Sequence, residues 1–149
     1  MQERQVARKI DIKTINSGNF VQVERKSEED RYLPNYIEVN GMKISRVRIL
    51  ATVIDKFVSE DGNYATLTLD DTTDTIRCKI FMNSNFSDNI SRQNLIDLEA
   101  INNIEKGDLI DVIGKIREYN EERYIQPEII VKIEDPNFEV LRKLEIEKY

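Results

Sequence analysis

Basic and aromatic residues alternate with apolar ones in residues 76–82, Ile-Arg-Cys-Lys-Ile-Phe-Met. This period of two is typical of a β-strand whose two faces meet different surroundings. The apolar residues would face a core, whereas Arg77, Lys79 and Phe81 would point the other way. Cations bind phosphates and an aromatic ring stacks on bases, so this face suits a nucleic-acid strand. A solvated strand face with one exposed phenylalanine would show the same pattern, so the strand alone leaves both interpretations open.

The residue types that most catalytic and metal sites require are missing from the sequence. It contains no histidine, which excludes Ser–His and Cys–His nucleophiles and most catalytic zinc sites. One cysteine cannot form a zinc ribbon, and the isolated glycines form no phosphate-binding loop. Asp70, Asp71 and Asp74 could hold a hard cation, but without the glycine and bidentate glutamate of a calcium loop they are better interpreted as turn residues. We therefore expect no enzyme, no cofactor and no metal.

The charge balance of the chain limits how it could bind nucleic acid. The 149 residues carry 22 Lys and Arg against 28 Asp and Glu, so the net charge is −6. Affinity for phosphates comes mainly from Lys and Arg, so this balance argues against a general nucleic-acid binder. The acidic excess lies mainly in residues 83–149. Any binding surface must therefore be a local one.

The sequence carries no signal for secretion or membrane insertion. It has no run of about 18 apolar residues, so we expect no transmembrane helix and no membrane partner. The N-terminal residues lack the apolar stretch of a signal peptide. The single cysteine, Cys78, cannot form an internal disulfide and alternates with apolar positions, so we expect a buried thiol. These features predict a cytoplasmic protein.

The hydrophobic pattern of the whole chain predicts five strands and two helices. The first strand places Val47 and Val53 on its core face, and Arg48 and Lys56 share its other face. The first three strands are joined by short polar turns and predict an antiparallel meander. The predicted strands are 44–58, 64–69, 75–82, 109–119 and 123–133, and the predicted helices are 91–102 and 138–148.

Five strands with a helix between the third and the fourth is the order of the oligonucleotide/oligosaccharide-binding (OB) barrel, a mainly all-β fold. Its ligands lie on the outer face of strands two and three and on two loops, here 58–63 and 119–123. Gly114 predicts a bulge or a sharp coil in the fourth strand, and Pro127 confines the fifth to an edge or a bulge. The expected regions are an N-terminal extension with short strands (1–43), the barrel (44–133) and a C-terminal helix (134–149).

Basic and aromatic side chains on the expected ligand surface are the candidate nucleic-acid-binding residues. The outward face of the third strand contributes cations and a ring, and the outward face of the fourth strand adds more. The candidates are Arg48, Lys56, Tyr64, Arg77, Lys79, Phe81, Lys115, Arg117, Tyr119 and Arg123.

The C-terminal helix carries an apolar stripe that needs a surface to pack against. Pro136 suits an early helical position, and the residues after it are too apolar for a free tail. The helix either closes the open end of its own barrel or bundles with partner subunits, and the sequence supports the two interpretations equally. The candidate interface residues are Phe138, Val140, Leu141 and Leu144.

Four segments of the chain resemble a known family. Residues 46–53 and 67–77 look like the first three barrel strands of the middle subunit of replication protein A, a pattern shared by its archaeal relatives and by Stn-type telomere-capping proteins. The segment 124–129, Tyr-Ile-Gln-Pro-Glu-Ile, looks like an archaeal replication protein A subunit, as does the ending 135–145. The resemblance covers roughly residues 30–149.

This resemblance implies an accessory subunit of a replication protein A-like complex that binds single-stranded DNA in replication and repair. It also implies that the C-terminal helix joins other subunits in a bundle. Lys79 stands where the middle subunit usually places a stacking aromatic residue, and Phe81 could take that role. Two further interpretations stay open, a scaffold that contacts only proteins and an OB-fold protein that binds RNA.

Overall fold

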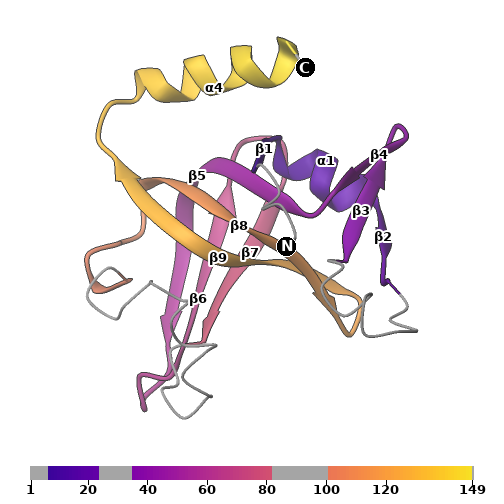
Figure 1. Ribbon diagram of the computed structural model, residues 1–149. Coiled ribbons are helices and arrows are strands. Elements are labelled where there is room, and N and C mark those ends of the chain that lie inside the picture. Colours follow the sequence, from indigo (N-terminus) through magenta and orange to yellow (C-terminus); the bar gives the residue numbers. More distant parts are fainter. Residues whose placement is uncertain (1–6, 24–34, 82–100, 149) are drawn as a thin grey trace, which may run out of the picture.

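Five β-strands form a closed barrel at the centre of the protein (Figure 1). The structure, a computed structural model, describes residues 7–23, 35–81 and 101–148 of the chain. The barrel strands are β5 (Arg46–Val58), β6 (Tyr64–Asp70), β7 (Thr75–Phe81), β8 (Leu109–Tyr119) and β9 (Glu122–Ile133).

The barrel closes because its first and fourth strands pair with each other. β5, β6 and β7 form an antiparallel meander, β7 pairs in parallel with β9, and β9 pairs antiparallel with β8. β8 then pairs antiparallel with residues 46–52 of β5 and completes the ring. The five predicted strands and their OB-barrel arrangement are confirmed.

The inward side of every barrel strand contributes to one hydrophobic core. On β7, Cys78 is fully buried, and Ile76 and Ile80 are almost so, which is the predicted core face. Met82, predicted on the same face, lies outside the described residues. The outward residues of β7 are therefore the ones predicted from the alternation, Arg77, Lys79 and Phe81.

A β-bulge at Ile54 exchanges the two faces of β5 near its end. The pairing register of β5 against β6 shifts by one residue at this point. Beyond the bulge, Lys56 lies opposite the core residue Leu67, and Phe57 turns outward. The prediction that Lys56 shares the outer face with Arg48 is wrong. It assumed an unbroken alternation along β5, whereas the bulge adds one residue between the two positions.

A second bulge lies between β8 and β9, where the sequence predicts one. Glu128 is the extra residue, between Gly114, which pairs with Pro127, and the next pair of the ladder. A Cβ atom on Gly114 would lie 2.4 Å from the carbonyl oxygen of Gln126, so only glycine fits. The predicted bulge positions of Gly114 and Pro127 are confirmed.

The N-terminal extension adds residues to the core of the barrel. Ile12 and Ile15 lie on one face of a short helix and are fully buried in the barrel's core cluster. The sequence allowed either a strand or a helix between Val6 and Phe20, and the structure has a helix there with a short strand on each side. The division of the chain at residue 43 stays a prediction. The elements are β1 (Arg8–Lys9), α1 (Ile12–Ser17), β2 (Asn19–Val21), β3 (Tyr36–Val39) and β4 (Met42–Ile44), of which the last three form a second sheet.

The aspartates at the end of β6 and in the turn that follows it accept hydrogen bonds from backbone and side-chain N–H groups. Asp71 accepts a hydrogen bond of 2.8 Å from the backbone of Ile12, and Asp74 accepts one of 2.9 Å from the side chain of Asn16. Asp70 accepts a backbone N–H within the turn itself. The interpretation as turn residues is confirmed, and the described part of the chain contains no group of three residues placed to hold a metal ion.

The C-terminal helix α4 (Asn137–Lys148) is confirmed close to its predicted bounds. It follows β9 and extends back over the end of the barrel beside β5 and β1 (Figure 1). Most of the helix predicted at 91–102 lies outside the described residues. Its last two residues, Ile101 and Asn102, have helical geometry, and Ile101 is fully buried in the core.

The burial of Cys78 gives a direct test of the two faces of β7. Burial also raises the pKa of its thiol, so the native protein should react very slowly with thiol reagents. Reaction then requires opening of a core strand, and native labelling should be more than about a thousandfold slower than labelling of the unfolded chain. Stopped-flow labelling at neutral pH measures both rates, and similar rates would mean that the faces are exchanged.

Candidate nucleic-acid interface

Three aromatic side chains form a cluster where β5 and β7 end and β6 begins. The rings of Phe57 and Tyr64 are 6.3 Å apart, and those of Tyr64 and Phe81 are 5.2 Å apart. Cross-strand pairing produces this arrangement, because Tyr64 lies directly opposite Phe81 and the bulge at Ile54 turns Phe57 to the same side. Phe57 is 55% exposed and Phe81 46%, so both rings present surface on which a base can stack.

Two cations lie next to this cluster on β7 and share one carboxylate. Arg77 Nη1 is 3.1 Å from Glu122 Oε2, and Lys79 Nζ contacts Glu122 Oε1. Lys79 Nζ also lies 4.7 Å from the centre of the Tyr124 ring. The hydrogen bond from Lys79 is the main reason that the pKa of the Glu122 carboxyl lies below its usual value. Glu122 is therefore ionised at neutral pH.

Strand β8 continues the same surface beyond β9. Arg77 and Arg117 both lie beside Tyr124, one on each neighbouring strand, so the three form one row across the outer face. Lys115 is exposed, and Tyr119 is 68% exposed at the end of the strand. Seven of the ten predicted residues are thus gathered on one face, namely Tyr64, Arg77, Lys79, Phe81, Lys115, Arg117 and Tyr119.

The other three predicted residues lie elsewhere in the described structure. Lys56 donates a 2.7 Å hydrogen bond to the carbonyl oxygen of Ile104. Arg123 donates to the backbone carbonyls that end α1, including that of Ile15 at 2.6 Å. Arg48 pairs with Asp111 under α4. Each of these side chains binds a partner that is distant in sequence. The alternation of residues along one strand cannot reveal such partners.

Helix α4 is attached to the barrel by charged groups. Arg142 binds both carboxylate oxygens of Asp111, at 3.2 and 2.9 Å, and Arg48 binds the same carboxylate at 2.7 Å. Asp111 is only 6% exposed and Arg142 only 7%. Burial alone would raise the pKa of Asp111, but the hydrogen bonds from the two guanidinium groups outweigh it and hold the pKa below its usual value.

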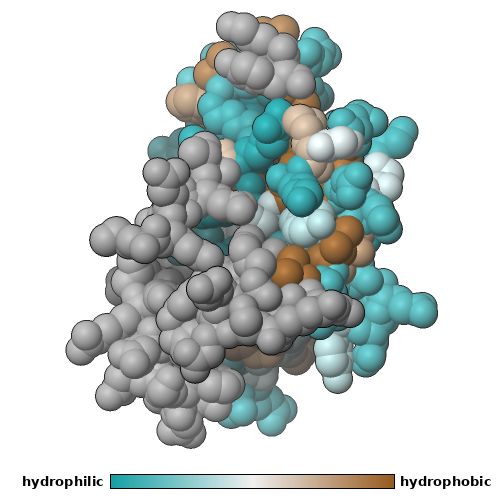
Figure 2. Space-filling view, turned by 45° about the vertical axis from the view of Figure 1, so that its right-hand side comes forward, coloured by the Kyte–Doolittle hydropathy of each residue, from teal (hydrophilic) through white to brown (hydrophobic). Residues whose placement is uncertain are grey.

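The predicted interface residues of α4 remain exposed in this arrangement. They are Phe138, Val140, Leu141 and Leu144, each between 48% and 61% exposed. A space-filling view shows hydrophobic as well as hydrophilic residues on the surface of this helix at the top of the molecule (Figure 2). Within the described part of the chain, no other element covers this apolar stripe of α4.

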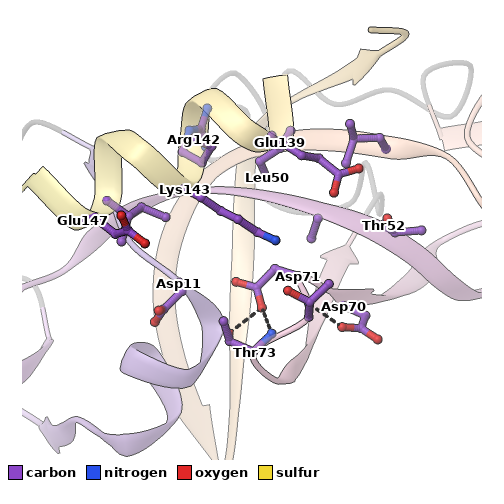
Figure 3. A pocket seen from close by; sticks show the side chains of 14 residues that line it. Asp11, Leu50, Thr52, Asp70, Asp71, Thr73, Glu139, Arg142, Lys143 and Glu147 are labelled. Carbon is purple, nitrogen blue, oxygen red and sulfur yellow. Dashed lines mark hydrogen bonds between the residues drawn. The ribbon is translucent and has the colours of Figure 1, made fainter. Parts of the chain in front are cut away.

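A cavity of about 300 Å³ separates α4 from β5 and the turn after β6 (Figure 3). Most of the residues that line it are charged or polar, and apolar side chains such as Leu50 and Ile146 also contribute to its walls. Asp70 and Asp71 face it from the turn, and Lys143 reaches toward them from the helix. The two carboxylates already accept hydrogen bonds from backbone N–H groups. They therefore give no sign that the cavity is a ligand site.

Comparison with known proteins decides the family. The family model described as "OB-fold nucleic acid binding domain" matches residues 43–135, more than half of the chain. The chain belongs to this OB-fold family. Its matched region begins just before β5 and ends after β9, so it coincides with the barrel.

Individual relatives carry the same OB fold. The human CST complex subunit STN1 is 31% identical over an alignment of 136 residues that covers 80% of this chain and 36% of the relative. The chain thus spans about a third of that protein's length. Among solved structures, the S. pombe Stn1–Ten1 complex has a TM-score of 0.72 at 18% identity, covering 97% of this chain and 91% of that chain. A replication protein A heterotrimer bound to ssDNA has a TM-score of 0.68 at 13% identity, covering 97% and 94%. The two structures show that the fold is shared.

No helix in the described residues has the length and apolar character needed to cross a bilayer.

The charged attachment of α4 predicts a specific response to loss of Asp111. Asp111→Asn leaves the buried guanidinium of Arg142 without its carboxylate, which should weaken helix docking by roughly 1–3 kcal/mol. Hydrogen–deuterium exchange of α4 should accelerate while exchange of the barrel strands stays unchanged. Asp55→Asn, at an exposed ion pair with Lys106, is the matched control and should have little effect.

Acid should have the same effect on α4 as the substitution. The pKa of Asp111 is depressed in the folded state, so its contribution is complete above the unfolded value of about 4 and is lost as pH falls through the folded value. If α4 docks equally strongly in Asp111→Asn and in the wild type at neutral pH, Asp111 does not hold the helix on the barrel.

Proposed function

We propose that the chain binds single-stranded DNA through the end of β5 and the outer face of β6, β7, β8 and β9. The observation that carries this proposal is the exposed aromatic cluster of Phe57, Tyr64 and Phe81 beside the cations of β7. Stacking on such rings is worth roughly 1–3 kcal/mol per base and tolerates any base sequence. Arg77 and Arg117 lie further along the same face, where they can contact the phosphate backbone.

The role that fits this surface is that of an accessory subunit in a replication protein A-like complex, acting in DNA replication and repair. The fold shared with the Stn1–Ten1 complex and with the replication protein A heterotrimer supports it. Within that class we propose an archaeal counterpart of the middle subunit, without catalytic activity and located in the cytoplasm. The net charge of −6 implies that the isolated chain binds weakly and that partner subunits raise the affinity.

Helix α4 is the proposed contact with those subunits. Its inward side is held by Arg142 and Asp111, so its orientation does not depend on burying the apolar residues. A helix of this length is marginal on its own in water, and exposed Leu141 and Leu144 would gain from a second apolar surface. A bundle with helices of partner subunits would bury them.

The DNA-binding proposal predicts a loss of affinity when the rings are removed. Phe57→Ala and Phe81→Ala should each weaken binding of oligothymidylate roughly 5- to 150-fold, because each removes a stacking platform. Fluorescence anisotropy with a labelled oligonucleotide at low salt measures the change. Thermal unfolding should stay close to the wild type, since both rings are about half exposed.

Val131→Ala is the matched control for these variants. Val131 is also about half exposed on β9, but it lies opposite Asp111 near α4, away from the cluster. Its affinity should equal that of the wild type. Unchanged affinity in both phenylalanine variants would favour the protein-only scaffold, and clearly tighter binding of oligouridylate would favour the RNA-binding alternative.

The assembly proposal predicts that charges on the apolar stripe abolish association. Leu141→Glu with Leu144→Glu should leave the barrel folded but prevent capture of the subunits that the full chain retains from an extract of its own organism. Lys143→Gln also lowers the charge of α4, on another side of the helix and without adding a carboxylate opposite Asp70 and Asp71, and it should retain them. Retention by the double variant, or a full chain that stays monomeric with every candidate subunit, would show that α4 is not the contact.

A further inference from the structure

One carboxylate occupies the centre of the basic part of the interface. Glu122 is the first residue of β9 and follows a tight turn in which Asn120 and Glu121 both have positive φ. That turn and the pairing of Glu122 with Tyr119 keep its side chain on the outer face of the barrel. There it contacts both Arg77 and Lys79.

These contacts resemble the way a nucleic-acid phosphate would be bound. A phosphate offers anionic oxygens to neighbouring cations, and here the two oxygens of Glu122 each accept from a different cation, Arg77 on one and Lys79 on the other. A strand that enters the interface meets cations already neutralised in part. Its phosphates must displace the carboxylate or bind beside its negative charge.

We propose that Glu122 substitutes for a phosphate group in the empty interface and competes with the backbone of a bound strand, so that binding depends mainly on base stacking. The inference rests on the proposed function. Displacement is possible because the Glu122 side chain is 38% exposed and its ion pair with Arg77, which is 58% exposed, is of the weak surface kind. Without the carboxylate, Lys79 would still be held over the Tyr124 ring. The Arg77 side chain reaches solvent, so it would be free to meet a phosphate.

This competition has a measurable consequence for salt dependence. Each cation that neutralises a phosphate of a single strand adds about 0.7 to the slope of log K against log salt concentration. The wild type should therefore show a shallow slope. Glu122→Gln keeps the shape of the side chain but removes its charge, which frees Arg77 and Lys79 for phosphates.

The test compares Glu122→Gln with Glu121→Gln, which loses the same charge at the neighbouring exposed residue. Oligothymidylate and an abasic oligonucleotide of equal length are titrated over a range of salt concentrations. Glu122→Gln should bind both probes roughly 2- to 30-fold more tightly at low salt, with a slope steeper by up to about 1.4. Glu121→Gln should match the wild type within about twofold, and Glu122→Ala should follow Glu122→Gln.

The outcomes separate this inference from the proposed function. Equal affinities and slopes in the Glu122 and Glu121 variants would overturn the inference, while a loss of affinity in Phe81→Ala would still support DNA binding. Weaker binding by Glu122→Gln would also overturn it, because the carboxylate would then position the cations. If neither the wild type nor any variant binds either probe at low salt, the proposed function is wrong and the inference fails with it.

Discussion

Closure of the five strands into a ring determines the direction of every side chain on them. The pairing of β8 with β5 leaves no open edge between these strands, so the register of the whole barrel is fixed. Each residue then points into the core or outward, and only a bulge can exchange the two. The bulge at Ile54 does so at the end of β5, where it turns Phe57 toward Tyr64 and Lys56 toward the core. The place of Phe57 in the aromatic cluster therefore depends on one inserted residue.

Charge in this protein is used first to hold the fold together. Arg123 closes the end of α1 against the barrel, and Arg142 and Arg48 share the buried Asp111. These cations count in the composition but are not available to phosphates. On the outer face, Glu122 also reduces the net charge of the cations beside it. An acidic protein with this distribution can bind a strand only where rings supply much of the energy.

Period-two alternation predicted the strands, their core faces and the outward residues of β7. In a strand with one buried face, apolar residues on that face alternate in sequence with polar residues on the other. It also located the second bulge, since Gly114 and Pro127 are residue types with a restricted place in strands. It failed at Ile54, where no unusual residue marks the insertion, and so misplaced Lys56 and missed Phe57. The partner of Arg123 could not be predicted either, because α1 lies more than a hundred residues earlier in the chain.

The two candidate surfaces lie at opposite ends of the barrel, so the proposed DNA strand and the proposed partner subunit would not compete for space. The aromatic cluster lies where β6 begins and β7 ends, whereas α4 lies over the other end of these strands (Figure 1). A polar attachment suits α4 in this position. Asp111 and Arg142 orient the helix by directed hydrogen bonds, which leaves Leu141 and Leu144 for a second chain. A helix held by its apolar side would have closed the barrel and left no apolar surface for the proposed partner subunits. The buried ion pair of Asp111 and Arg142 therefore positions the helix without using that surface.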